Sequence, residues 1–166
     1  MNMATEAQKI KRSKFATFLN TGTKTAPVWS RFGKGVTEQT VDYGTNVTEE
    51  QYIDEDSARS SVEGYKLNIP SPMTAFAGDP IFDYVDKLRI ERRVLSEAET
   101  ECLFVYLYKE EESGAYPAER MDCAIKINSF GGPANESVKL DYDVVPSGDP
   151  AHGTFDPGTK TFAEAA

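Results

Sequence analysis

Side chains able to act as acids, bases or nucleophiles are few in this sequence, and their spacing does not form a catalytic group. The one histidine, His152, stands in the glycine- and proline-rich residues 148–153. A Ser-His or Cys-His pair would therefore depend on a mobile residue without packed support. Cys102 and Cys123 lie within strand-like runs and lack CxxC spacing, which is typical of small buried residues. We predict a surface histidine, two core cysteines and no disulfide.

Motifs for metals and cofactors are missing as well. Asp54, Glu55 and Asp56 lie close enough together to suggest a glycosidase site or a calcium site. The mid-loop glycine and the terminal glutamate of an EF-hand, however, are absent. Gly33-Lys34-Gly35 lacks the spacing and the following hydroxyl of a phosphate-binding loop. The run Glu110-Glu111-Glu112-Ser113-Gly114 is typical of a solvated loop. The prediction is a protein that is not an enzyme and has no catalytic, cofactor-binding or metal-binding residues.

Length and charge limit the domain organisation and the kinds of partner that this chain can have. A chain of 166 residues suits one domain, residues 1–166, with little to pack in residues 1–10 and 163–166, which we expect to be flexible. The 18 basic and 27 acidic residues give a formal net charge of −9, which disfavours nonspecific attraction to nucleic acid and to anionic membranes. The N-terminus lacks an apolar signal core, so we expect synthesis in a cytoplasm and no membrane partner.

One segment, residues 79–93, has the pattern of an amphipathic helix. Asp79 is placed to accept hydrogen bonds from the first turn, and Pro80 occupies the first helical position, where a missing N–H costs nothing. The side chains at helical spacing that we expect to face the body are Ile81, Tyr84, Val85 and Leu88.

The rest of the chain alternates in the manner of β-strands. Strand-like runs cover residues 14–20, 28–32, 36–43, 101–109, 120–130 and 137–145, and a closing hairpin follows at residues 153–162. The run 101–109 is apolar on both faces, which predicts a central strand covered on each side. The predicted fold class is mainly β with one flanking α-helix: two packed antiparallel sheets forming a sandwich or barrel-like body.

Residues 45–61 do not fit into that body. Runs 49–56 and 59–69 are predicted as the two strands of one hairpin, which is rich in Glu, Asp and Ser. Neither face of the first run is apolar enough for a monomer core. We expect this segment to project as a β-hairpin arm. Long polar strands with open edges invite pairing with other chains, which favours self-assembly as the function.

The order of several short stretches resembles the major tail protein, or tail tube protein, of long-tailed bacteriophages of Gram-positive bacteria. The resemblance covers about residues 15–162. It is carried by Tyr52-Ile53-Asp54-Glu55-Asp56, Gly78-Asp79-Pro80 with Phe82-Asp83-Tyr84, Leu103-Phe104-Val105-Tyr106-Leu107-Tyr108, Tyr116-Pro117-Ala118-Glu119, Ser129-Phe130-Gly131-Gly132, Gly148-Asp149-Pro150 and Gly153-Thr154-Phe155.

This resemblance implies a structural virion protein that polymerises as stacked hexameric rings into a tail tube and conducts the genome into the host. It implies the tape measure, tail terminator and distal tail proteins as partners, and a location in the phage tail, with the host cytoplasm as the place of assembly. Viral DNA would pass through the lumen without specific binding, because an acidic wall repels phosphate.

Two sets of residues follow as site candidates. The inter-subunit or inter-ring candidates come from the arm: Glu49, Glu50, Tyr52, Ile53, Asp54, Glu55 and Asp56. The lumen-facing candidates are acids predicted on outward strand faces: Glu38, Asp42, Asp122, Asp141 and Asp143. Two alternatives stay open, namely a tail terminator or other β-sandwich virion component, and a carbohydrate-binding module in which Trp29 and the tyrosines stack on sugars.

Overall fold

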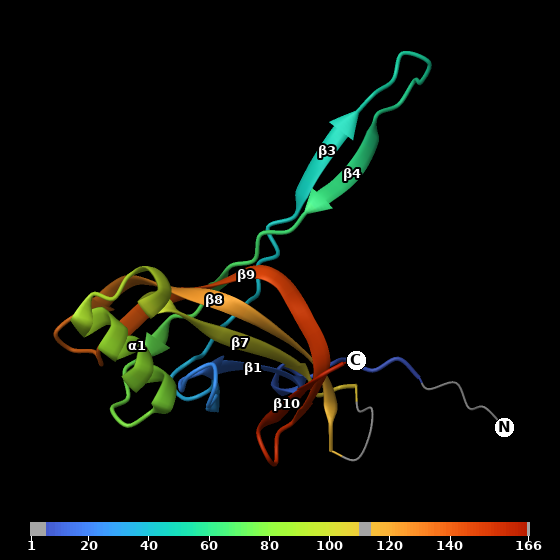
Figure 1. The fold of residues 1–166 in the computed structure, drawn as a ribbon. Coiled ribbons are helices and arrows are strands. Elements are labelled where there is room, and N and C mark those ends of the chain that lie inside the picture. The colour runs from blue at the N-terminus through green and yellow to red at the C-terminus, as the bar shows by residue number, and fades with distance from the viewer. Residues whose placement is uncertain (1–5, 110–113, 166) are drawn as a thin grey trace.

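The computed structural model describes residues 6–109 and 114–165, and it shows a mainly β protein with one α-helix (Figure 1). The helical elements are η1 (Arg12–Lys14), α1 (Pro80–Glu91) and η2 (Leu95–Ala98). The strands are β1 (Phe15–Asn20), β2 (Trp29–Arg31), β3 (Asn46–Glu50), β4 (Arg59–Gly64), β5 (Ile69–Pro70), β6 (Met73–Thr74), β7 (Glu99–Tyr106), β8 (Tyr116–Gly131), β9 (Lys139–Asp156) and β10 (Thr161–Glu164).

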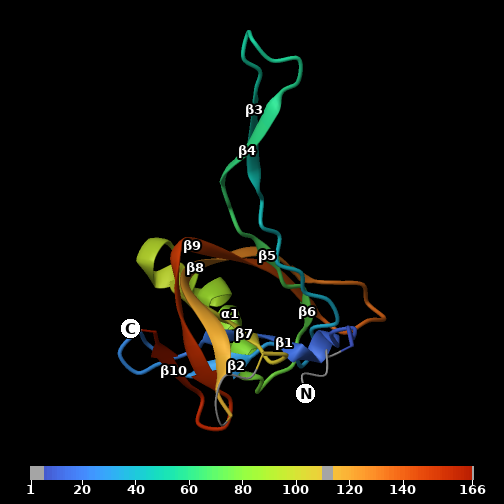
Figure 2. The ribbon, with the colours of Figure 1, turned by 90° about the vertical axis from the view of Figure 1, so that its right-hand side faces the viewer.

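Two antiparallel sheets hold these strands. The larger, eight-stranded sheet runs in the order β10-β9-β8-β7-β1-β2, with β5 and β6 pairing β9 beside this path, and it curls into a barrel-like body (Figure 2). The smaller sheet is the hairpin β3-β4, which projects from the body as an arm. The predicted fold class is confirmed, including the flanking helix and the projecting hairpin.

Helix α1 forms where its pattern predicts. The Asp79 side chain accepts a hydrogen bond from the Phe82 backbone N–H at 3.1 Å, Pro80 is the first helical residue, and the helix ends at Arg92, whose φ of 52° is left-handed. The predicted stripe is confirmed: Ile81, Val85 and Leu88 are buried, and the half-buried Tyr84 packs against the same core. Phe82, which the stripe did not include, is buried as well. The apolar face of α1 is broad at its first turn, where the helix lies on the sheet.

Strand β7 is covered on both faces, as its two-sided apolar pattern predicts. Cys102 and Phe104 pack with α1, whereas Leu103 and Val105 pack on the opposite face. The first core also contains Leu19, Ile69, Met73, Ile81, Phe82, Val85, Leu88, Met121, Cys123, Ile125, Leu140, Tyr142 and Val144. The second contains Ala16, Phe18, Trp29, Ala118 and Phe155.

The long strands β8 and β9 reach both cores because they bend. Between the pairs Arg120↔Ala151 and Asp122↔Ser147, β9 contains two more residues than β8, and Gly148 within this bulge has a left-handed φ of 74°. The bend carries Phe155 over the sheet to the Phe18 ring, with 4.7 Å between ring centroids. Extra residues in a bulge increase local twist, so the sheet curls here.

Two sequence predictions fail in this C-terminal region. Residues 148–153 were expected to be a loop, but they continue β9: residues 148–150 form the bulge, and residues 151–153 pair with β8. Ala163 and Glu164 were expected to be flexible, but they complete β10 by pairing with Thr154 and Gly153. In the first case cross-strand pairing outweighs the turn preference of glycine and proline, and in the second it orders residues that have little apolar surface to pack.

Residues 36–43 were predicted as a half-solvated strand, and this prediction is wrong. The segment is irregular apart from one bridge between Asp42 and Asn68, and its Gln39 side chain is buried. Gln39 accepts a hydrogen bond from Thr17 Oγ1 of β1 at 2.5 Å, and its Nε2 donates to Ser71 Oγ at 2.8 Å. Side-chain bonds rather than a backbone ladder therefore connect β1 to the segment after β5 and bring the curled sheet close to closure.

Candidate assembly surfaces

The side chains able to do chemistry are His152, the two cysteines and the acidic residues. In the described part of the chain, no cluster of three or more His, Cys, Asp or Glu side chains is arranged to hold a metal ion. His152 is exposed and lies within β9 opposite Glu119, not in the mobile loop that its neighbours predicted. Across residues 6–109 and 114–165, no helix is long and apolar enough to span a membrane.

Cys102 and Cys123 are both free and buried, as predicted. A hydrogen bond with Cys102 and burial raise the pKa of the Cys123 thiol. A protonated, buried thiol is a poor nucleophile, so these cysteines behave as core residues.

The arm is the feature that the body does not explain. Strands β3 and β4 pair from Asn46↔Gly64 to Glu50↔Arg59, and the hairpin lies clear of the eight-stranded sheet (Figures 1 and 2). All its residues from 46 to 64 are exposed except the half-buried Glu55 and Gly64. An isolated two-stranded hairpin is at best marginally stable in water, so the arm needs support from outside its own chain.

The predicted acidic strand at residues 49–56 is only partly a strand. β3 ends at Glu50, and residues 51–58 form the connection at the tip of the arm. Local polar contacts hold this tip: Tyr52 Oη donates to Glu50 Oε2 at 3.0 Å, and Arg59 Nε donates to Glu55 Oε2 at 2.9 Å. Each of these contacts joins residues that lie close together in the sequence, two residues apart for Tyr52 and Glu50 and four for Arg59 and Glu55. Local contacts of this kind stabilise a turn at the tip in place of longer pairing between the strands.

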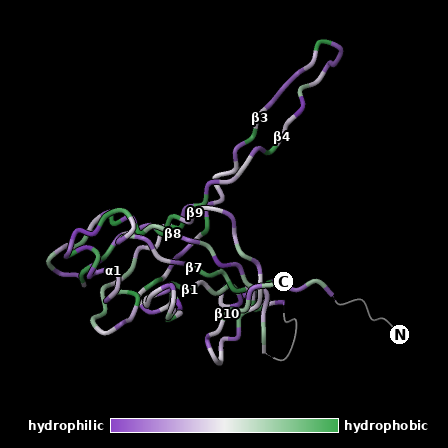
Figure 3. The backbone as a smooth tube through the Cα atoms, viewed as in Figure 1, coloured by the Kyte–Doolittle hydropathy of each residue, from purple (hydrophilic) through white to green (hydrophobic). Residues whose placement is uncertain are grey.

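Hydrophobic side chains are nevertheless displayed along the arm. Figure 3 shows a mostly hydrophilic hairpin with a hydrophobic point at its tip. There Ile53 is fully exposed, at 109%, and Tyr52 is 52% exposed. Lower on the arm, Val47, Val62 and Tyr65 are each at least half exposed. Of the seven inter-subunit candidates, Tyr52 and Ile53 are the apolar ones, and Glu49, Glu50, Asp54, Glu55 and Asp56 surround them.

The lumen candidates do not form one group. Asp141 and Asp143 lie on the outward face of β9, and Asn68, which bridges to Asp42, donates to Asp143 Oδ2 at 3.4 Å. Asp42, Asp141 and Asp143 are thus neighbours at the base of the arm.

The other two lumen candidates lie elsewhere. Asp122 is on the same outward face, farther along β8, and pairs with Lys24 at 3.2 Å. Glu38 is separate, in a groove that Arg12 and Arg31 also line.

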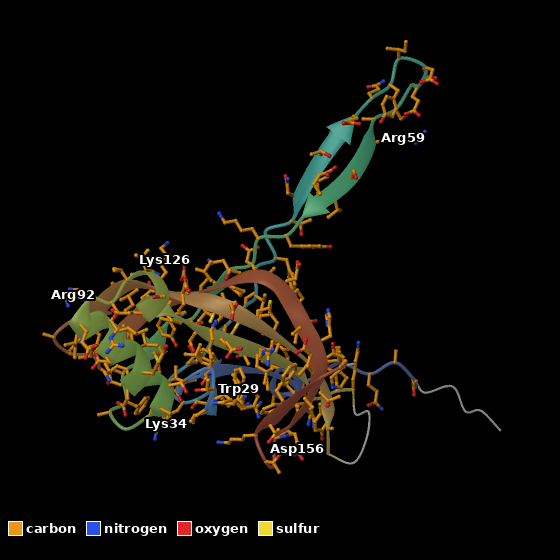
Figure 4. The ribbon with its side chains drawn as sticks, viewed as in Figure 1. Trp29, Lys34, Arg59, Arg92, Lys126 and Asp156 are labelled. Atoms are coloured by element: carbon orange, nitrogen blue, oxygen red, sulfur yellow. The ribbon has the colours of Figure 1, made fainter. Side chains whose placement is uncertain are left out.

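A further surface, at the C-terminal end of α1, was missed by sequence reasoning. From the sequence, Arg89, Arg92 and Arg93 are basic residues late in the predicted helix, where the helix dipole favours them. In the structure they lie beside Val94 and the end of β8, where the Arg89 guanidinium stacks 3.8 Å from the Phe130 ring centroid. Arg92 stands at the outer end of the helix (Figure 4). The available signal was the alternation of arginines with exposed apolar residues in Arg89-Ile90-Glu91-Arg92-Arg93-Val94-Leu95.

Comparisons with known proteins find similarity in fold alone. No family model matches the chain, and no curated protein sequence matches it. A chain in the structure of the tail of an empty gene transfer agent particle, refined with C6 symmetry, has a TM-score of 0.62 at 8% identity and covers 86% of this chain and 98% of that one.

Two further solved structures are similar to this chain. One is the anti-feeding prophage cap, which terminates a tube, with a TM-score of 0.52, 12% identity and coverage of 92% of this chain and 96% of that one. The other is the six-fold symmetrised anti-feeding prophage baseplate, with a TM-score of 0.50, 9% identity and coverage of 90% and 97%. The fold of this chain is therefore one found in the tail of a gene transfer agent particle and in the cap and baseplate of the anti-feeding prophage.

Proposed function

We propose that this chain is a structural tail tube protein of a long-tailed bacteriophage of a Gram-positive host, assembling as hexameric rings that stack into a tube. The observation that carries the proposal is the arm: a hairpin, with a fully exposed isoleucine at its tip, that packs on nothing in its own body. An exposed hydrophobic element of this kind marks a protein interaction site. Similar folds in six-fold symmetric particles support a ring as the assembly.

In this proposal the chain carries no catalytic role, and the tube conducts the viral genome. Its partners in the virion are the tape measure, tail terminator and distal tail proteins, and assembly takes place in the host cytoplasm. The outward face with Asp122, Asp141 and Asp143 is assigned to the lumen, with Asp42 beside it, because fixed negative charge keeps DNA from binding the wall. Glu38, on another surface, is not included in this wall.

Electron micrographs of the purified protein test the proposal. We expect long tubes to form spontaneously, since a heterologous contact that does not terminate propagates without limit. Deleting residues 49–56 is expected to leave a folded monomer, with circular dichroism and thermal midpoint close to wild type, that forms no tubes. Normal tubes from this deletion would contradict an assembly role for the arm.

A tail terminator is the second candidate, because the tube-terminating cap of the anti-feeding prophage has a similar fold. A terminator is expected to form closed single rings that do not stack under any protein concentration. Monomers that bind sugar would instead favour a carbohydrate-binding module.

A further inference from the structure

A groove of about 490 Å³ lies between the end of α1 and the end of β8. Its floor contains Ile125, Ile127 and Phe130 of β8, and its wall contains Arg92, Arg93 and Val94. The groove therefore combines an apolar floor with cationic side chains at its edge. Such a site fits a partner that offers one hydrophobic side chain flanked by carboxylates.

At and next to the groove residues Arg89 and Val94, the chain exposes several apolar side chains. Ile90 is 59% exposed, Val94 66% and Leu95 82%, and all three lie at the end of α1 or the start of η2. Leu95 also has a left-handed φ of 55°, a conformation that is costly for a leucine. A strained backbone that presents an apolar side chain to solvent points to a contact with another molecule.

The cations at the groove are anchored. Arg89 pairs with Asp86 at 2.6 Å and stacks on Phe130, while Arg92 Nη1 donates to the Arg89 carbonyl at 2.7 Å. Arg93 pairs with Glu91. Guanidinium groups held in this way can bind a carboxylate with little further loss of side-chain freedom.

The tip of the arm has the complementary chemistry. Ile53 is its fully exposed hydrophobic side chain, and Glu49, Glu50, Asp54 and Asp56 are exposed around it. Of the described surfaces, this is the one where a fully exposed hydrophobic residue stands among several carboxylates. The arm of the same chain points away from α1 (Figure 1), so the two surfaces meet only between copies. From residue 45 to residue 53 the extended chain reaches about 25–30 Å, enough to cross to a neighbouring subunit.

We propose that the arm tip of one copy inserts Ile53 into the groove between α1 and β8 of a second copy, with its carboxylates facing Arg92 and Arg93. The inference rests on the proposed function and names the surface that receives the arm. A heterologous contact of this kind, arm to groove, leaves the pair of copies with one free groove and one free arm, so it extends from subunit to subunit.

Disulfide trapping tests the contact directly. The double variant Ile53→Cys with Val94→Cys is expected to form intermolecular links under mild oxidation, so that most of the protein migrates as dimers and higher species. The two native cysteines are buried and do not compete. The matched control is Ile53→Cys with Ile10→Cys, since Ile10 is also exposed, at 58%, and stands among Lys9, Lys11 and Arg12. Links through position 10 and none through position 94 would overturn the proposal and make the basic N-terminal segment the receiver.

Charge reversal gives an independent test. Arg92→Glu with Arg93→Glu is expected to abolish tubes, as is Asp54→Lys with Asp56→Lys, and the chain carrying all four changes is expected to regain them. Failure of the fourfold variant, when both double variants are folded, contradicts the pairing. Wild-type tubes without a link between positions 53 and 94 refute this contact and leave the proposed function standing. Linked closed rings would retain the contact and refute the tube, and a wild-type protein that stays monomeric would refute both.

Discussion

Gln39 offers the sharpest test of how the body closes. Its side chain is 8% exposed and forms hydrogen bonds with Thr17 and Ser71, which are themselves buried. Gln39→Ala removes both bonds, each contributing about 1 kcal/mol, and leaves the Thr17 hydroxyl without its acceptor, which costs about 1–3 kcal/mol more. With partial relaxation of the site, we expect a loss of about 2–4 kcal/mol from a total of about 5–15 kcal/mol.

Urea denaturation measures this loss. The midpoint is expected to fall while the m-value is unchanged, because the same surface is exposed on unfolding. In a chain of this size the thermal midpoint should fall by about 5–15 °C. Gln51→Ala is the matched control, since Gln51 is exposed on the arm and bonds only to the Glu55 carbonyl. Equal stability of the two variants would refute the closure by Gln39.

A second variant separates lost bonds from lost packing. Combining Gln39→Leu with Thr17→Val and Ser71→Ala removes the polar groups together, and such replacements can be nearly neutral because no buried group is left unpaired. We expect this triple variant to be more stable than Gln39→Ala. If it is equally or less stable, the position depends on packing and not on the hydrogen bonds.

Three further outcomes follow from the geometry. Leu88→Ala should lower the free energy of unfolding by about 2–5 kcal/mol by leaving a cavity under α1, while Ile90→Ala on the exposed face should change it by less than about 0.5 kcal/mol; equal effects in thermal melts would contradict the assigned face. Tyr142→Phe should raise the unfolding midpoint or leave it unchanged, because burial raises the pKa of Tyr142 and its hydroxyl has no hydrogen-bond partner among the described residues; a loss above about 1 kcal/mol would reveal such a partner. Asp141→Lys with Asp143→Lys should leave tubes intact and slow DNA ejection from particles, with relief by added salt; unchanged ejection would put these acids outside the lumen.

Local chemistry made α1 predictable. An aspartate, a proline and an apolar stripe all favoured the same helix, so its position, its cap and the stripe were correct, and Phe82 is buried in addition. The central strand β7 was predictable for a similar reason, since its residues 102–106 are apolar on both faces, and such a run has few other positions in a fold. Agreement among several local preferences is what allows sequence reasoning to succeed.

Residues 36–43 show where such reasoning fails. Their alternation fits a strand, but in the structure they form only one backbone bridge, and the buried Gln39 side chain makes hydrogen bonds to Thr17 and Ser71 instead. The prediction for residues 148–153 fails in the opposite direction. Their glycines and proline favour a loop, yet a bulge lets β9 continue through them. Both outcomes depend on the curl of the whole sheet, which no local window contains.

The arm and the groove differ in what the sequence could reveal, although the proposed contact joins them. The arm was predictable because its two faces carry too little apolar surface to pack into a core, which indicates a segment that projects from the body. The groove had no such sign, because Val94 follows α1 and Phe130 ends β8, and only the fold brings them together. Burying Ile53 alone is worth about 1.5–3 kcal/mol, too little for a stable dimer but repeated at every subunit of a ring or tube. In the proposed assembly, a weak contact of this size would let rings form reversibly, and the tube would become stable because each subunit would be held by both its arm and its groove.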